Sequence, residues 1–200
     1  MTESDLPDEL KKLVHVRVWS GFFSFDDVLE AVLEGIDEGG FSEEELDLGQ
    51  ADVEPYILSE FAAKAEAAKN WPAQTECDKL ADAFEKLTKS GIISLEYAGY
   101  DQSDGWTEYH EFVANFSLTN VRGGCFYHYQ DLERAVDGEG LHLTFGAPSG
   151  EDADGIAVAK EVVQVLQQFG LKPTWNETIK ERIFCQSIGN ADSWAFYVNV

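Results

Sequence analysis

The sequence predicts an α+β fold, with a helix-rich amino-terminal half that holds one or two strands and a carboxy-terminal antiparallel sheet. Apolar residues recur at helical spacing through most of residues 1–90, and short apolar runs alternate with helical segments from 91 onward. The chain has 200 residues, 44% of them hydrophobic and 12% aromatic, which is enough for a sizeable core. We expect an acidic, mainly helical subdomain over residues 1–90 and an α+β subdomain over 91–200, packed as one compact unit.

The first elements are predicted from alternation and from a helix start signal. In Leu13 to Trp19, three valines alternate with His15 and Arg17, which is typical of a half-buried strand. After Gly21, the spacing of Ser24 and Asp27 approximates a capping box and predicts a helix that ends at Gly39-Gly40.

Three further helices are expected before residue 91. Ser42 and Glu45 predict the start of a short acidic helix, and Pro55 is expected in the first turn of a helix that runs to about Asn70. Thr75 is expected to cap a third helix, which stops at Ser90-Gly91.

Residues 92–175 predict the order strand, helix, strand, strand, helix, strand. The expected ranges are 92–97, 104–117, 125–129, 141–145, 151–169 and 171–175, with one helical turn in the connection 130–140. This is the split motif of ferredoxin-like folds, in which two helices cover one face of an antiparallel sheet. Pro173 marks the last strand as an edge strand, and strands at 182–188 and 194–199 are expected to extend the sheet.

Charge is the strongest compositional signal. The net charge is −24, from 38 acidic and 14 basic residues, which makes binding to nucleic acid or to anionic lipid unfavourable. Residues 1–60 hold 17 acids and 3 bases, so the amino-terminal third is expected to present a negative surface. Such a surface can attract a basic protein partner, although solubility alone or adaptation to high salt are alternative explanations.

The remaining composition predicts a cytoplasmic protein. No apolar run approaches the roughly 20 residues that a membrane span needs, and the amino terminus is acidic, unlike a secretory signal. Cysteines occur at 77, 125 and 185 with no C-x-x-C spacing, which indicates reduced core residues. The four histidines show no short-range metal-ligand spacing, so neither a metal nor a cofactor is indicated, and a metal site assembled from distant positions stays open as an alternative.

The segment YAGYDQSDGW, residues 97–106, is the first candidate for contact with a ligand or partner. It fails the calcium-loop pattern, and no basic residue between 90 and 121 favours phosphate binding. We interpret it mainly as a turn in which Asp101 and Ser103 bond nearby backbone donors and Asp104 caps a helix that begins at Gly105 or Trp106. Because loops after strands often carry function, Asp101, Ser103 and Asp104 remain candidate contact residues.

The segment CFYHYQD, residues 125–131, is the second candidate. Cys125 and His128 would point to opposite faces of a strand, so a nucleophilic dyad is not indicated. Asp131 is interpreted as a helix cap, with Arg134 one turn later as its surface partner or as a contact for an anionic ligand. His128, Asp131 and Arg134 therefore complete the set of candidate contact residues.

Two stretches carry a resemblance to a known group. They are WPAQTECDKLADAFEKLTKSGIISLEYAGYDQSDG, residues 71–105, and CFYHYQDLERAVDGEGLHLTFG, residues 125–146. Together they resemble a bacterial family of uncharacterised proteins, a domain of unknown function, with the patterns W-P..T-x-C-D-x-L..A-F, A-G-Y-x-x-S-D-G and C-F-Y-H-x-Q-D-L-E-R-A-V. The resemblance is strong over about half of the chain and weak in the acidic amino-terminal third. It implies no activity.

Two hypotheses for the function follow. The first is a non-catalytic interaction or regulatory protein, whose negative amino-terminal surface binds a basic protein while the sheet serves as scaffold. The second is an enzyme or small-ligand-binding protein with a pocket between the two halves, lined by residues 101–105 and by His128, Asp131 or Arg134. The absence of nucleophile, metal and phosphate signatures favours the first hypothesis.

Overall fold

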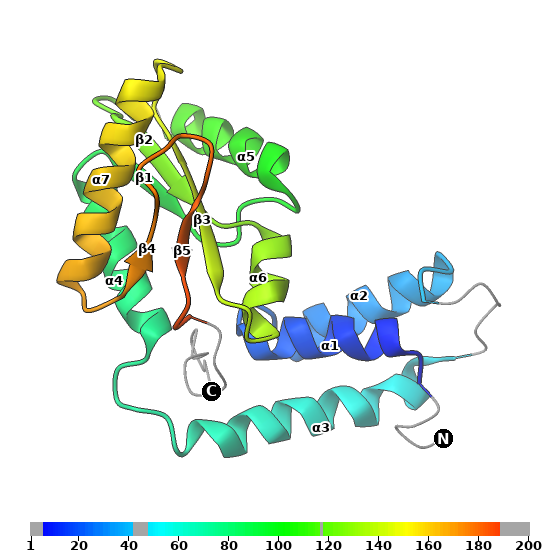
Figure 1. Ribbon diagram of the computed structural model, residues 1–200. Coiled ribbons are helices and arrows are strands. Elements are labelled where there is room, and N and C mark those ends of the chain that lie inside the picture. Colours follow the sequence, from blue (N-terminus) through cyan, green and yellow to red (C-terminus); the bar gives the residue numbers. More distant parts are fainter. Residues whose placement is uncertain (1–5, 42–47, 117, 189–200) are drawn as a thin grey trace. The chain divides into compact units, whose positions relative to one another are not determined.

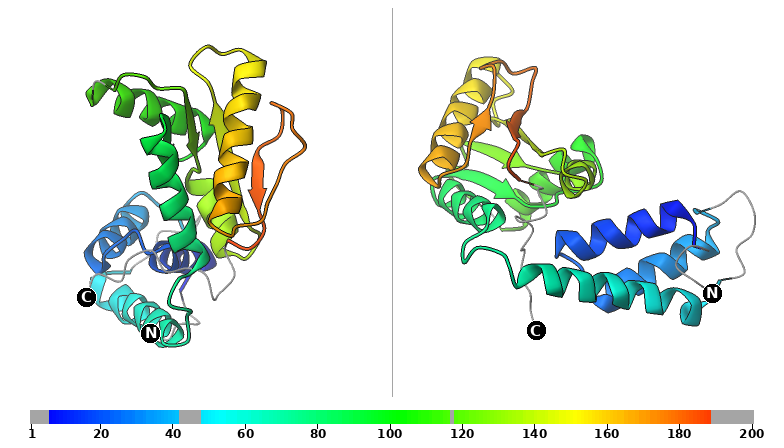
Figure 2. Two further views of the ribbon diagram at one scale, coloured as in Figure 1. Left: turned by 90° about the vertical axis from the view of Figure 1, so that its left-hand side faces the viewer. Right: turned by 60° about the horizontal axis from the view of Figure 1, so that its bottom comes forward.

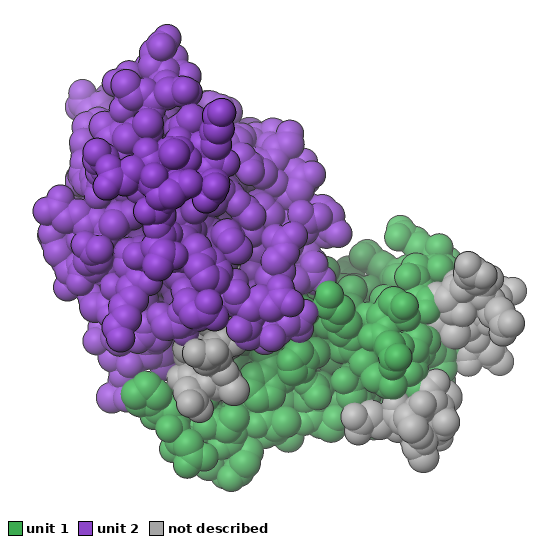
Figure 3. Space-filling model, in the orientation of Figure 1, with its two compact units in different colours: residues 1–72, 194–200 green, residues 73–193 purple. Residues whose placement is uncertain are grey.

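The computed structural model describes residues 6–41, 48–116 and 118–188, and the chain divides into two compact units. The helical unit comprises the described residues up to Pro72, and the sheet unit begins at Ala73. Figure 3 colours the two units separately. The α+β class predicted from the sequence is confirmed, but the chain forms two compact units where one was expected.

The described part of the helical unit consists of three helices that pack on one another (Figure 1). They are α1 (Asp8–Ser20), α2 (Phe25–Asp37) and α3 (Gln50–Ala68). Their shared core is formed by buried apolar side chains: Leu6, Leu10, Val14, Val18, Val28, Val32, Phe41, Val53, Tyr56 and Ile57. The short helix predicted from Ser42 lies largely outside the described residues.

The predicted strand at 13–19 is wrong, because this segment lies within helix α1. Leu10, Val14 and Val18 recur every four residues and are fully buried, which is the spacing of one helix face. The alternating valines of this segment include two of the same residues and suggested a strand instead. Val16 is also fully buried, so the alternating valines reflect a helix covered on more than one side.

The predicted helix starts at Ser24 and Thr75 are confirmed, whereas the predicted first-turn position of Pro55 is wrong. Ser24 and Thr75 each accept a hydrogen bond from the backbone N–H three residues later and form complete capping boxes. Pro55 lies inside α3, five residues after its start at Gln50. Because Pro55 lies beyond the first turn, its missing N–H removes one intrahelical hydrogen bond, which a proline in the first turn would not do.

The sheet unit contains four helices and five strands within the described residues (Figures 1 and 2). The helices are α4 (Glu76–Lys89), α5 (Gln102–Asn115), α6 (Tyr129–Val136) and α7 (Asp152–Gln168). The strands are β1 (Ile92–Leu95), β2 (Gly123–Phe126), β3 (Leu141–Gly146), β4 (Pro173–Thr174) and β5 (Ile183–Cys185). Strand β2 ends before residues 127–129, which were predicted to belong to it, and α6 is longer than the single turn expected.

The strand order is β1-β2-β3-β5-β4, and the ferredoxin-like order is not confirmed. Strands β1 and β2 are adjacent and parallel, joined through α5, whereas a split motif would place another strand between them. All other pairs are antiparallel. Strand β5 lies between β3 and β4, so it is inserted into the sheet, and β4, with Pro173, is an edge strand as predicted.

Helices cover both faces of the sheet, unlike the single covered face expected. Helices α4 and α7 pack together and against the sheet on one face, and α5 lies on the other (Figure 1). Gly105 of α5 lies so close to the sheet that an added Cβ would be 2.3 Å from Cε2 of Phe126. On the opposite face, a Cβ at Gly123 would be 2.6 Å from Cγ2 of Val158 in α7. Glycines thus allow both layers to approach β2 closely.

The boundary between the two units differs from the predicted one. Helix α4 was expected in the helical subdomain but packs against β1 and α7, so the sheet unit begins at Ala73 and not at residue 91. The buried face of α4 consists of Cys77, Leu80, Ala83, Phe84 and Leu87. Within the described residues, no helix combines the length and apolar character that crossing a bilayer requires.

Candidate functional site

The two predicted candidate segments lie side by side at the carboxyl ends of the parallel strands β1 and β2. The backbone N–H of Ala98 donates to the carbonyl of Tyr127 at 2.8 Å, and that of Tyr129 donates to Gly99 at 3.0 Å. The ring of Tyr129 stacks on that of Tyr100, with centroids 5.7 Å apart. Because carboxyl ends of parallel strands share one edge of a sheet, loops distant in sequence meet there.

The first segment is a turn and helix cap, but the capping residue differs from the one predicted. Asp101 Oδ1 accepts hydrogen bonds from the backbone N–H groups of Ser103, at 2.7 Å, and Asp104, at 3.1 Å. Helix α5 therefore begins at Gln102, with Asp101 as its N-cap, and Asp104 lies in the first turn. The side chains of Ser103 and Asp104 are exposed, whereas the Asp101 carboxylate is used by the helix.

The second segment contains the strongest concentration of buried charge in the sheet unit. Asp131 is fully buried, and His128 is 3% exposed. Nε2 of His128 lies 2.9 Å from Oδ2 of Asp131, and Nη1 of Arg134 lies 3.2 Å from Oδ1. His128, Asp131 and Arg134 are therefore in contact, and the predicted pairing of Arg134 with Asp131 is observed. His128, not Asp131, is the N-cap residue of α6.

Arg182, which the sequence analysis did not select, completes this network. Its Nη1 lies 2.9 Å from Oδ1 and 2.8 Å from Oδ2 of Asp131, across 51 positions of sequence. The same Nη1 is 3.1 Å from Nε2 of His128, and with Nε2 protonated both groups donate to the carboxylate. We define His128, Asp131, Arg134 and Arg182 as the Asp131 network.

The network controls the protonation of Asp131. Burial by itself would raise the pKa of Asp131, but the hydrogen bond from His128 and the positive charge of Arg182 outweigh it and hold that pKa below its usual value. Asp131 is therefore an ionised carboxylate at neutral pH. A buried carboxylate of this kind requires its cation, because an unpaired buried charge is costly.

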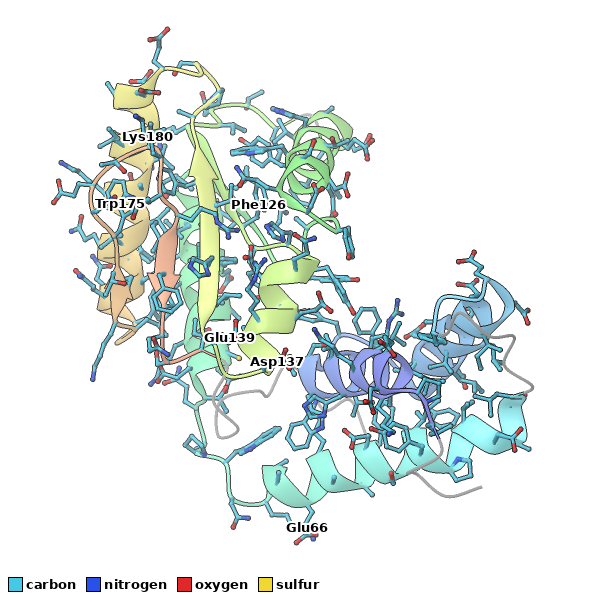
Figure 4. All side chains as sticks on the ribbon, turned by 45° about the vertical axis from the view of Figure 1, so that its right-hand side comes forward. Glu66, Phe126, Asp137, Glu139, Trp175 and Lys180 are labelled. Carbon is cyan, nitrogen blue, oxygen red and sulfur yellow. The ribbon has the colours of Figure 1, made fainter. Side chains whose placement is uncertain are left out.

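A surface depression adjoins the network on the sheet face. It has a volume of about 620 Å³ and is lined by His142, Thr174, Trp175, Asn176, Glu181, Arg182 and Phe184. His142 and Phe184 are paired across β3 and β5, and their rings lie 4.7 Å apart. We call this feature the Arg182 depression. Trp175 from its wall is labelled in Figure 4.

The imidazole of His142 is kept neutral by its surroundings. Burial, followed by the charge of Arg182, lowers the pKa of His142, so its imidazole is neutral at pH 7. Its Nδ1 is buried and has no hydrogen-bond partner among the described residues. The depression therefore has a neutral imidazole beside a fixed guanidinium.

Two further groups, the half-buried Glu96 and the buried Cys125, have raised pKa values. Burial raises the pKa of Glu96 to about 7, and its Oε1 has no partner among the described residues. Cys125 is buried, and burial raises the pKa of its thiol far above the usual value, which opposes thiolate formation. Within the described residues, no cluster of three His, Cys, Asp or Glu side chains forms a metal site.

The helical unit carries a different feature, on α2. Asp26, Glu30, Glu34 and Asp37 are spaced by four, four and three residues, so they follow one face of the helix, and all are exposed. We call them the α2 acidic row. Within the described residues, none of them has an ion-pair partner, whereas Lys11 pairs with Asp8 and Lys69 with Glu66.

The sequence between Arg17 and Lys64 contains no basic residue that could neutralise the row locally. Lys64 itself is buried, 7% exposed, and donates to the carbonyl of Val18 at 3.0 Å. Arg17 lies over the ring of Phe23, 4.7 Å from its centroid. Neither cation forms an ion pair with the row among the described residues.

These features define an α+β protein of two compact units, one with a row of exposed acids and the other with a buried carboxylate that holds an arginine at a surface depression. The chain belongs to the family Domain of unknown function (DUF6891), whose model matches residues 3–189. The match includes the acidic amino-terminal third, where the resemblance seen in the sequence is weak. No curated protein and no solved structure matches the chain.

Proposed function

We propose that this protein is a non-catalytic interaction protein whose helical unit binds a basic protein partner through the α2 acidic row. One observation carries the proposal: four carboxylates follow one exposed helix face and have no ion-pair partner among the described residues. Unpaired exposed acids retain their full charge for an incoming cationic surface, which accelerates association and selects partners by sign. Figure 4 shows oxygen-tipped side chains projecting from α2.

Helix α2 packs on its neighbours through apolar residues on the face opposite the acidic row. Val28 and Val32 are fully buried and anchor the helix to α1 and α3, so the acidic face is not needed for packing. Acidic residues at 26 and 27 also suit the helix amino terminus, but Glu34 and Asp37 lie near the carboxyl end, where negative charge is unfavourable. Solubility requires charge but not this placement.

The experiment compares binding by the wild type with binding by two variants of equal net charge. The first variant neutralises three of the four acids of the row, with Glu30→Gln, Glu34→Gln and Asp37→Asn. The matched control neutralises three exposed acids of the sheet unit, with Glu111→Gln, Glu139→Gln and Asp152→Asn. Binding to fluorescein-labelled decalysine and capture of basic proteins from a lysate are measured in low and high salt.

We expect the row variant to lose binding by about tenfold or more at low salt, and the control to lose much less, since steering by charge depends on where the charges lie. High salt should abolish the difference. If the two variants weaken decalysine binding equally, only the net charge matters, and the proposed role of α2 fails.

A further inference from the structure

The geometry of Arg182 leaves half of its guanidinium group available. Asp131 is contacted only through Nη1, and among the described residues Nε and Nη2 have no hydrogen-bond acceptor. Nε and Nη2 form one edge of the planar group, and this edge presents two parallel N–H donors at the spacing of a carboxylate. The side chain is 27% exposed and lines the Arg182 depression, so the edge is accessible from solvent.

The arginine is also fixed in position before any ligand arrives. Asp131 is fully buried and receives hydrogen bonds from His128 and Arg134 as well as from Arg182. The acceptor is therefore held in place by α6. An arginine with one nitrogen anchored to a buried carboxylate loses less conformational freedom on binding than a free surface arginine.

The remaining wall suits a flat organic group. Phe184 and Trp175 supply aromatic surface, and the neutral imidazole of His142 lies against the Phe184 ring. His142 contributes a buried Nδ1 without a partner among the described residues, and Asn176 and Thr174 add neutral polar groups. Mixed aromatic and polar walls with few fixed donors are typical of small-molecule sites.

We propose that the Arg182 depression binds a small aromatic monocarboxylate, whose carboxylate receives hydrogen bonds from Nε and Nη2 of Arg182 and whose ring lies against Phe184 and Trp175. This site lies within the sheet unit, and the proposal is independent of partner binding by α2. Nothing in the family description assigns it.

The charge of the molecule selects a monoanion over a phosphate. A net charge of −24 opposes a dianion more strongly than a monoanion, and Glu181 places a carboxylate in the wall of the depression itself. Among the described residues that line the depression, Arg182 is the one cation. The Asp131 carboxylate already offsets part of the positive charge of Arg182. The depression therefore favours a ligand that carries a single negative charge.

Benzoate is the probe, titrated into the full-length protein labelled with ¹⁵N. The indole N–H of Trp175 donates to the carbonyls of Thr178 and Glu181, so its NMR signal reports directly on the wall. We expect this signal and the Nε–H of Arg182 to shift, with saturation at a dissociation constant in the millimolar range or below, as befits a small ligand. Inorganic phosphate at the same ionic strength should bind at least several-fold more weakly.

One variant and a matched control test the electrostatics without changing any residue of the Asp131 network. Glu181→Gln removes the opposing carboxylate and should strengthen benzoate binding by about two- to fivefold, as expected for one partly screened like charge. Glu177→Gln removes one charge from the same loop, at a residue that does not line the depression. In the wild type, the Glu177 carboxylate pairs with Lys160. This control variant should change the affinity much less.

Arg182→Lys keeps the positive charge beside Asp131 but lacks the two-donor edge, and it should weaken benzoate at least tenfold. Since this variant can fail to fold, the pair of glutamate variants decides independently. Equal effects of Glu181→Gln and Glu177→Gln, shifts confined to signals outside the depression, or tighter binding of phosphate than of benzoate would each overturn the proposal.

Discussion

The α2 acidic row and the Asp131 network use the same chemical group in opposite ways. On α2, four carboxylates lie exposed and without ion-pair partners among the described residues. In the sheet unit, the Asp131 carboxylate is fully buried and in contact with one histidine and two arginines. One arrangement leaves charge free on the surface, and the other uses charge to fix side chains.

This difference separates what each region can do. An exposed carboxylate is solvated by water and costs little to keep, so it can act at a distance on a charged partner. A buried carboxylate is stable only with its cation in place, so it acts locally and determines where Arg182 lies. The helical unit is therefore suited to attraction by charge, and the sheet unit to a defined contact.

The largest expected effect comes from breaking the buried network. Asp131→Ala should reduce the free energy of unfolding by about 3–5 kcal/mol, because it leaves Arg182 without its buried counter-ion. Urea denaturation at pH 7 measures the loss. Glu30→Gln, which neutralises an exposed carboxylate of the α2 row, is the control and should change stability by no more than about 1 kcal/mol. Similar losses in both variants would remove the distinction between the two regions.

The pH dependence of the same variant sharpens the comparison. Because the folded pKa of Asp131 lies below its unfolded value, its stabilising contribution is present above pH 4 and is lost as the pH falls through the folded pKa. Denaturation series from pH 7 to pH 2 should therefore show a smaller acid destabilisation in Asp131→Ala than in the wild type. A parallel pH profile would show that other carboxylates dominate.

An intermediate effect is expected from Glu96, which is half-buried and has a raised pKa of about 7. The folded state keeps the proton that the unfolded state loses above about pH 4.5, so this group destabilises the protein as the pH rises from 4.5 to 7. Glu96→Gln should increase stability by about 1–3 kcal/mol at pH 8 and by little at pH 4. Thermal unfolding at the two pH values measures this, and an equal gain at both would contradict the assignment to ionisation.

A smaller effect separates the two helix caps. Thr75 of the sheet unit is 2% exposed, whereas Ser24 of the helical unit is exposed, although both form capping boxes. Thr75→Ala should cost about 1–2 kcal/mol and Ser24→Ala about 0.5–1 kcal/mol. Amide hydrogen exchange resolves the loss in each helix, with faster exchange expected in α4 for the first variant and in α2 for the second. Faster exchange in both helices in either variant would contradict this local effect.

The smallest effect concerns repulsion within the α2 row. Asp26 and Glu30, and Glu30 and Glu34, are like-charge pairs at i, i+4 spacing. Neutralising Glu30 should stabilise the helix by about 0.2–0.5 kcal/mol for each pair at low salt, and by less at high salt. Urea midpoints at two ionic strengths measure the change. A destabilisation would mean that Glu30 has a favourable contact.

Local rules predicted helix caps in both units and several elements of the sheet unit, but not the order of the strands. The caps at Thr75 and Ser24, helix α7 and the edge position of Pro173 follow from short-range chemistry that the sequence displays. The placement of β5 between β3 and β4 does not, since register and order depend on pairing between residues far apart. Helix α1 was missed because alternating valines outweighed the four-residue spacing of its buried face.

The candidate site shows the same division. His128, Asp131 and Arg134 are each three residues apart along the start of α6, so their grouping could be seen in the sequence. Arg182 could not be added, because nothing short-range links it to Asp131 across 51 positions. The only signal was a lone arginine immediately before a short apolar strand, and many such residues are solvent-exposed.

By itself, the sequence determined the α+β class, the family resemblance and the excess of acid in the first third of the chain, since these depend on composition and local spacing. Only the tertiary structure decided that Asp131 is buried and that Arg182, just before β5, contacts it. It also decided that the α2 acids lie exposed along one helix face without partners among the described residues. The reason is physical: burial and ion pairing depend on which segments of the chain meet, and long-range packing determines those meetings.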